Sequence, residues 1–333
     1  MSKVRISVAI AVTSLVAAGW AAPAVAQEVV LRFAHEAPET TIKGQTADKL
    51  AELVSKYTNG EVKVQVYPGA QLVPTQQELR AVSRGQVDIV APYTSYFSAI
   101  DRAWDVFYQP TLFADPKEAI EIFEGPVGRS LLDRVNQKES GLVGLSIWHD
   151  GPVYLFTRDR EVKAPADMAG LKIRVAPSAP LEALIKDASA TPVAMPAPDV
   201  YLALQQGVAN AVATTPTYAG PARWNEVLHH GTRVMWGEGG YGLVMNEKSL
   251  GKLSDSQRKG FMKAVEEASR WNHQLALENI KHWEDWLGDK GITWYSPTDA
   301  ELARWRTAGS AIWKTQPDVV KDYVKQIREQ TKR

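Results

Sequence analysis

Arg174 is the side chain in this sequence best suited to bind an acid. It stands near the end of an expected strand at 172–175, where polar and apolar residues alternate. A guanidinium offers a planar fork that holds a carboxylate through two parallel hydrogen bonds. In a parallel sheet flanked by helices, ligands bind at the carboxyl ends of the strands, so this position suits an anion site. Taken alone, such a residue is more often a structural or surface arginine.

Several aromatic and polar side chains follow the ends of other expected strands and could line the same site. For each aromatic ring, packing in the core is as plausible as contact with a ligand. A histidine or an acid at the end of a strand can also simply cap a turn. Glu238, among glycines, could bind a hydroxyl, an amine or a cation, or be solvated. Tyr218 and Trp224 lie on an expected helix and are interpreted as packing residues. The candidates for ligand contact by position are Tyr93, Tyr96, His149, Asp150, Tyr154, Trp236 and Glu238.

The motifs of common enzyme classes are missing from the sequence. There is no G-x-S-x-G nucleophile elbow, no H-E-x-x-H zinc motif and no P-loop. His35-Glu36 lacks the second histidine of a zinc protease, and the absence of cysteine excludes thiol chemistry and cysteine-ligated metals. Carboxylates are numerous, but nothing marks a particular pair for hydrolysis. We therefore expect a binding protein rather than an enzyme, with no cofactor.

The N-terminus predicts export. Lys3 and Arg5 precede a mostly apolar stretch at 6–20, and Ala24-Val25-Ala26 gives the small-x-small pattern of a cleavage site. A membrane anchor is the alternative, but the apolar stretch is shorter than the ~20 residues of a membrane span. We expect residues 1–26 to be a signal peptide and the mature protein to be periplasmic.

The 333 residues carry 38 basic and 38 acidic side chains, so the formal net charge is zero. Such a balance gives no bulk attraction to nucleic acid or to an anionic membrane, and no nucleic-acid partner is expected. The length allows two domains with cores of their own. Without cysteine, an exported chain depends on packing rather than on disulfides for its stability.

Strands and helices alternate along most of the chain. In 29–91 a strand, helix, strand, helix and strand follow one another, and 172–213 repeats this order. The repetition predicts two α/β lobes rather than one large domain. Polar and glycine-rich segments at 149–152 and 237–240 are the expected crossovers between the lobes. The expected lobes are 27–151 with 240–279, and 152–239 with 280–333.

A long helix is expected towards the C-terminus. Ser254 and Gln257 form a capping box, and apolar residues then recur at helical spacing for more than thirty residues. At 1.5 Å per residue such a helix is about 50 Å long, which is too long for one small lobe. We expect it to brace both lobes. A second capping box, at Thr298 and Glu301, starts another helix, and a terminal helix follows.

Three motifs follow one another in the middle of the chain. They read Asp167 to Val175, Ala194-Met195-Pro196 and Asp199 to Ala211. In this order they resemble the D-x-x-G-x-K-x-R-V, P-M-P and E-V-Y-x-A-L-Q-x-G-x-x-D-G motifs of the DctP-type solute receptors of TRAP (tripartite ATP-independent periplasmic) transporters. The resemblance extends over nearly the whole mature chain. It implies a periplasmic-binding-protein fold with a ligand cleft between the lobes and a helix that spans both.

The resemblance also implies that Arg174 binds the carboxylate of the ligand. Elsewhere the chain departs from the better-known acidic-sugar receptors of the family. Their second arginine corresponds to Val153 here, and a phenylalanine of their cleft corresponds to Ala197. The changes remove charged or amide groups except at Glu36, so they predict one anion anchor with a more aromatic wall. Four further ligand-contact positions of those receptors correspond to Glu36, Tyr93, Tyr96 and Thr214.

The function implied by the resemblance is a periplasmic receptor that delivers a small organic acid to the membrane subunits of a TRAP permease. The altered pocket predicts a monocarboxylate with an apolar or aromatic part. The alternatives are a sensor module that reports its ligand to a signalling protein and a secreted hydrolase of a small acid. Some relatives bind a cation with the acid, and some dimerise through C-terminal helices, so a bound metal and the oligomeric state stay open.

Overall fold

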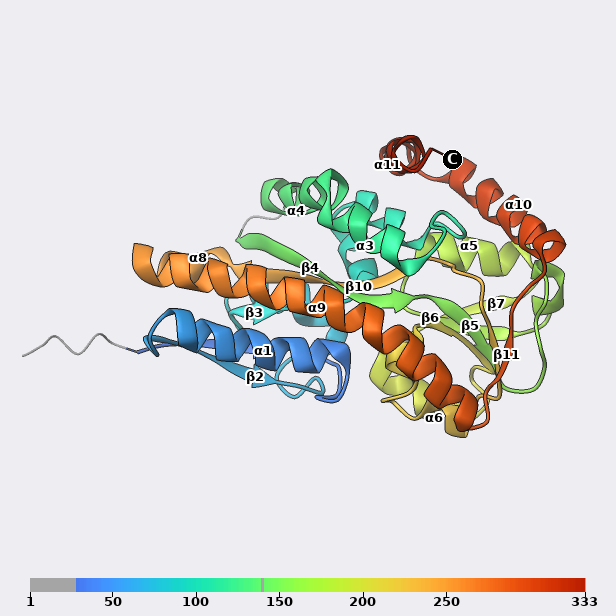
Figure 1. Ribbon diagram of the computed structural model, residues 1–333, viewed down its shortest axis with the longest axis horizontal. Coiled ribbons are helices and arrows are strands. Elements are labelled where there is room, and N and C mark those ends of the chain that lie inside the picture. The colour runs from blue at the N-terminus through green and yellow to red at the C-terminus, as the bar shows by residue number, and fades with distance from the viewer. Residues whose placement is uncertain (1–27, 139–140, 333) are drawn as a thin grey trace, which may run out of the picture.

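The computed structural model describes residues 28–138 and 141–332, which form two α/β lobes side by side (Figure 1). The predicted signal peptide, 1–26, lies outside the described residues. The strands are β1 (Val29–Ala34), β2 (Val62–Tyr67), β3 (Ile89–Val90), β4 (Leu142–Pro152), β5 (Tyr154–Thr157), β6 (Lys172–Val175), β7 (Thr191–Ala194), β8 (Ala211–Thr214), β9 (His230–Thr232), β10 (Glu238–Asn246) and β11 (Thr293–Tyr295).

Helices separate most of these strands, as the alternation in the sequence predicts. The α-helices are α1 (Ile42–Tyr57), α2 (Glu78–Ser83), α3 (Pro116–Glu124), α4 (Pro126–Lys138), α5 (Ala179–Asp187), α6 (Val200–Gln205), α7 (Pro216–Ala219), α8 (Glu247–Gly251), α9 (Asp255–Asp289), α10 (Asp299–Thr315) and α11 (Asp318–Gln330). The 3-10 helices are η1 (Thr75–Gln77), η2 (Thr94–Ala99), η3 (Arg102–Tyr108), η4 (Pro165–Met168), η5 (Ala197–Asp199) and η6 (Trp224–Glu226). No helix in the described ranges has an apolar stretch long enough to cross a membrane.

The sheet of the first lobe has the order β2-β1-β3-β10-β4. β1 runs parallel to β2 and β3, whereas β10 runs antiparallel to β3 and β4. Neighbouring residues face opposite sides, because side chains alternate along a strand. Phe33 and Leu243 thus belong to the core under α1 and α9, whereas Val90 and Val244 belong to a core that includes Leu131 of α4.

The sheet of the second lobe has the order β11-β9-β5-β8-β6-β7. β6 lies between β7 and β8 and is parallel to both, as the strand and helix order of 172–213 predicts. The sequence pattern also predicts a strand from Thr232 to Trp236, and this prediction is wrong. β9 ends at Thr232 because the chain turns there, with the Val234 N–H donating to the Thr232 carbonyl (2.9 Å). The three-residue strand β11 was not predicted.

Both crossovers expected between the lobes are strands rather than loops. β4 and β10 continue through them as an antiparallel pair, with Gly239 opposite Gly151. Gly151 has φ +131°, and a Cβ added there would lie 3.0 Å from Cγ1 of Ile280 on α9. A side chain at this position would therefore be strained and would press on the helix.

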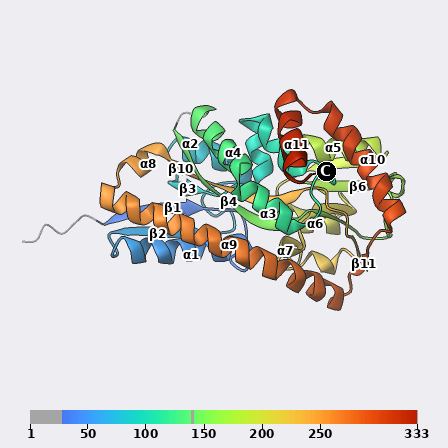
Figure 2. The same ribbon diagram turned by 45° about the horizontal axis from the view of Figure 1, so that its top comes forward.

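The long helix is confirmed as α9, with 35 residues and a capping box between Ser254 and Gln257. It runs along both lobes (Figures 1 and 2). Phe261 and Val265 near its start belong to the core of the first lobe, and Leu287 near its end belongs to the core of the second lobe. One continuous helix therefore packs into both lobes.

The C-terminal helices return from the second lobe to the first. α10 begins with the expected capping box at Thr298 and lies against α5. α11 packs against η3 and α4, where the hydroxyls of Ser130 and Tyr323 are 2.7 Å apart. The sequence assigned α11 to the second lobe, but these contacts are with residues assigned to the first. The lobe boundaries themselves stay a prediction.

Asn272 offers a test of how α9 is attached to the first lobe. Its Oδ1 accepts from the His149 N–H (2.6 Å), and its Nδ2 donates to the His149 carbonyl (3.2 Å) and to Thr46 Oγ1 (3.1 Å). Since Asn272 is fully buried, Asn272→Ala leaves buried backbone groups of β4 without a partner. We expect the free energy of unfolding, measured by urea denaturation, to fall by about 1–3 kcal/mol.

Asn279→Ala is the matched control, because the Asn279 amide donates only to the Leu275 carbonyl of the same helix (2.9 Å). An equal loss in both variants would contradict a special role of Asn272.

Candidate functional site: a cavity between the lobes

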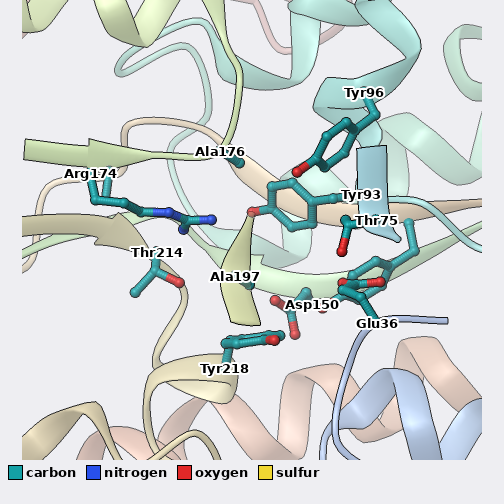
Figure 3. Close-up of a pocket in the computed structure, with 12 residues that line it drawn as sticks. Glu36, Thr75, Tyr93, Tyr96, Asp150, Arg174, Ala176, Ala197, Thr214 and Tyr218 are labelled. Atoms are coloured by element: carbon teal, nitrogen blue, oxygen red, sulfur yellow. The ribbon is translucent and has the colours of Figure 1, made fainter. Parts of the chain in front are cut away.

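A small cavity lies between the two lobes, with a volume of about 30 Å³ (Figure 3). The first lobe contributes residues that follow β1 and β3 or lie on β4 and β10, and the second contributes residues from β6 and β8. The cavity thus lies where the two α/β sheets face each other, the usual place for a ligand in this architecture. Its lining residues are Glu36, Thr75, Tyr93, Tyr96, Asp150, Arg174, Ala176, Ala197, Ala213, Thr214, Tyr218 and Tyr241.

Arg174 brings a positive charge into this cavity from β6. The residue is only 4% exposed, and its Nε and Nη2 donate to the Met195 carbonyl at 3.1 and 2.7 Å. Its guanidinium also lies 5.8 Å from the ring of Trp224. Within the described residues no carboxylate forms an ion pair with it. Burial lowers its pKa, but a guanidinium stays protonated in proteins. Arg174 therefore carries a buried positive charge that no carboxylate of the described residues balances.

Two phenols point towards the guanidinium, those of Tyr93 and Tyr96 (Figure 3). Burial raises the pKa of both, so both hydroxyls keep their protons. The Tyr96 hydroxyl is buried and lacks a hydrogen-bond partner in the part of the chain that the structure describes. The Arg174 end of the cavity is therefore a set of donors around a place where an anion would fit.

Glu36 and Asp150 make the other side of the cavity acidic. Glu36 forms an ion pair with Lys43, and both side chains are buried. Asp150 is also buried and accepts hydrogen bonds from the hydroxyls of Thr215 (2.6 Å) and Thr217 (3.0 Å). Burial raises the pKa of Asp150, which favours its protonated form.

The family model DctP, described as bacterial extracellular solute-binding protein, family 7, matches residues 33–318. The chain belongs to the DctP family. The C4-dicarboxylate-binding periplasmic protein DctP of Rhodobacter capsulatus is 33% identical over 285 residues, which is 85% of this chain and 85% of that protein. Members of this family are solute-binding receptors. This protein is therefore a receptor and not an enzyme.

Solved structures of TRAP solute-binding proteins have the same fold. One from Shewanella oneidensis, with bound succinate, has a TM-score of 0.85 and 30% identity, and the match covers 90% of this chain and 98% of that one. One from Pseudomonas aeruginosa, with bound L-malate, has a TM-score of 0.80 and 26% identity, and the match covers 86% and 99%. These matches confirm the two-lobed fold and the TRAP-type assignment of this DctP-family chain.

The cavity brings together a majority of the side chains that the sequence singled out. Arg174, Glu36, Tyr93, Tyr96, Asp150 and Thr214 all line it. Tyr218, interpreted as a packing residue, also lines it. Thr75 and Tyr241 were not predicted: Thr75 begins the 3-10 helix η1, far from any motif, and Tyr241 lies inside a strand rather than at its end. The alternation along β10 could have indicated Tyr241 only if the face towards the cavity were known.

Tyr154 and Trp236 lie away from this cavity. The Trp236 ring is buried and lies 5.8 Å from that of Trp305. The Tyr154 ring lies 6.1 Å from that of Trp294 and borders a separate surface hollow that includes Arg233. Both side chains thus pack against other rings and do not line the cavity, which fits the packing interpretation better than ligand contact.

His149 and Glu238 also do not line the cavity. They are completely buried beside each other, with 3.5 Å between His149 Nδ1 and Glu238 Oε1. His149 precedes Asp150 on β4, and neighbours on a strand point to opposite faces, so only Asp150 reaches the cavity. Within residues 28–138 and 141–332, no group of three or more histidine or acidic side chains is arranged to hold a metal.

Burial of His149 gives a prediction about pH. Burial lowers its pKa from 6.5 to about 3, so below about pH 6.5 the unfolded chain binds one more proton than the folded protein. The stability that His149 contributes is therefore fully present above pH 6.5 and is lost as the pH falls towards 3. In His149→Gln, we expect the decrease in unfolding free energy between about pH 5.5 and 4 to be smaller by about 1.4 kcal/mol per pH unit.

Urea denaturation at several pH values measures this slope. His282→Gln, at an exposed position of α9, is the control and should leave the slope close to that of the native protein. An unchanged slope in His149→Gln would mean that the buried imidazole does not oppose protonation.

Proposed function

We propose that this protein is a TRAP receptor that holds a short organic acid between its lobes, with Arg174 as the anchor. The observation that carries the proposal is the buried guanidinium without a counterion. An uncompensated buried charge is unfavourable, and a carboxylate bound to the free side of the fork removes that penalty through charge-assisted hydrogen bonds.

The proposed binding mode also favours one closed arrangement of the lobes. Arg174 and Thr214 belong to the second lobe, whereas Tyr93 and Tyr96 belong to the first, and all four line the cavity. An acid that touches both groups interacts most strongly when the lobes are together. Binding therefore shifts the population towards the closed form. In this proposal the closed receptor delivers its ligand to the membrane subunits of a TRAP permease, after export directed by residues 1–26.

The chemistry of the ligand follows from the charges around the cavity. Relatives carry C4-dicarboxylate-binding names, and the structures from Shewanella oneidensis and Pseudomonas aeruginosa hold succinate and L-malate, which supports an acid here. Among the residues that the structure describes, Arg174 is the one cation lining the cavity, so we propose a single carboxylate. Tyrosine rings and alanines cover the middle of the ligand. Since one water needs about 10–15 Å³, a cavity of about 30 Å³ suits a short chain.

A thermal-shift screen of the mature protein against short mono- and dicarboxylic acids tests the anchor. A ligand at one hundred times its dissociation constant adds about 2.7 kcal/mol of stability, which gives a clear rise in Tm. We expect at least one acid to raise the Tm of the native protein, and Arg174→Ala to abolish that rise. Arg174→Lys keeps the charge but loses the planar fork, so most of the rise should be lost as well.

Arg158→Ala is the matched control. Arg158 also lies in the second lobe and donates to a backbone carbonyl, that of Leu204 (3.1 Å), but it does not line the cavity. Its response to acids should equal that of the native protein. A full response in Arg174→Ala would refute the anchor, and the lack of any response in the native protein would refute a carboxylate ligand.

A further inference from the structure

We infer that the side of the cavity opposite Arg174 recognises a hydrogen-bond donor, so that the ligand is a short hydroxy acid with one carboxylate. This inference rests on the proposed function, because it takes the carboxylate to lie on Arg174. Figure 3 shows the guanidinium on one side and Glu36 with Thr75 on the other, with the phenols between them. An acid bound to Arg174 therefore directs its second end towards oxygen atoms.

Glu36 is held as an acceptor by the residues behind it. The ammonium of Lys43 is fully buried, pairs with Glu36 and lies 4.5 Å from the centre of the Tyr241 ring. Glu78 is a further buried carboxyl group. Burial raises its pKa well above the ordinary value, with the nearby Glu36 adding to this rise, which favours its protonated form. Lys43 and Glu36 thus balance each other, and this side of the cavity has no spare positive charge.

Asp150 is a second acceptor on this side of the cavity, and it also brings no positive charge. The hydroxyls of Thr215 and Thr217 donate to its two carboxyl oxygens and fix its orientation. Neither threonine oxygen nor the carboxyl group carries positive charge. A second carboxylate of a ligand would be buried beside Glu36 and Asp150 without a spare cation to pair with it, and an unpaired buried charge is unfavourable.

A hydroxyl group meets the requirements of this side better than a carboxylate or a methyl group. It donates to Glu36 or Asp150 without adding charge, and Thr75, which also lines the cavity, can donate to it or accept from it. A methyl group would remove water from these buried oxygens and give nothing in return, which is unfavourable. An ammonium group would also donate, but the charge of Glu36 is already balanced by Lys43.

Calorimetric titration of the mature protein with matched four-carbon acids tests the inference. The probes are 3-hydroxybutyrate, 4-hydroxybutyrate, 4-aminobutyrate, butyrate and succinate. We expect one of the hydroxybutyrates to bind at least about tenfold more tightly than butyrate and succinate. Butyrate leaves the acceptors without a hydrogen bond, and succinate brings a buried charge without a partner. Succinate binding as tightly as the better hydroxybutyrate, or tighter binding of 4-aminobutyrate, would overturn the inference.

Substitution of the acceptors gives an independent readout. Glu36→Gln removes the partner of Lys43 and frees an ammonium, so the ratio of hydroxybutyrate to succinate affinity should fall by about tenfold or more. Asp150→Asn keeps the shape and should lower the same ratio, which covers the case in which Glu36→Gln does not fold. Asp88→Asn is the control: Asp88 is a buried acid of the first lobe that accepts from the Ser249 hydroxyl (2.6 Å) and does not line the cavity, so the ratio should stay that of the native protein.

These results separate the inference from the proposed function. If acids bind through Arg174 but succinate is preferred, or if the ratio is unchanged in both acceptor variants, the hydroxy-acid inference fails and the receptor proposal stands. If no acid binds, or if Arg174→Ala binds acids normally, the proposed function fails.

Discussion

The ligand site depends on a positive charge that the fold keeps away from water. Parallel pairing of β6 with β7 places Met195 beside Arg174, and its carbonyl takes two N–H groups of the guanidinium. The side chain is thereby fixed, while the rest of the fork faces the cavity. A threonine and phenols whose pKa is raised by burial surround it, and no carboxylate of the described protein forms an ion pair with it. The anion site that we propose therefore depends on the pairing of two short strands.

Much of the fold could be predicted because its local signals agree with its packing. The alternation at 172–175, the capping boxes of α9 and α10 and the two strand–helix repeats all produced the expected elements. Wrong predictions concentrate where tertiary pairing decides the outcome. β11 has only three residues, and the expected crossovers at 149–152 and 237–240 look like glycine-rich turns. They are strands because each finds its partner in a segment about ninety residues away.

The candidate site was predictable to the extent that it lies at strand ends or within motifs. Arg174 and Thr214 were found through motifs, and Tyr93 through its place after a strand. Which face a side chain takes was not predictable: His149 and Asp150 are neighbours, yet one is enclosed with Glu238 and the other reaches the cavity. The surroundings of Glu36 were also hidden, because no motif in the sequence indicates its pairing with Lys43 at the start of α1.

The continuity of α9 restricts how the two lobes can separate. Its first half is embedded in one core and its last turns in the other, and it passes the β4–β10 ladder where Gly151 meets Ile280. Sliding the lobes apart would require the helix to stretch, which its hydrogen bonds oppose, whereas bending it costs far less. For the opening that we propose, this geometry therefore favours a rotation with its axis near that crossing. In such a rotation α9 bends without breaking, and the residues of each lobe move further the more distant they are from the axis.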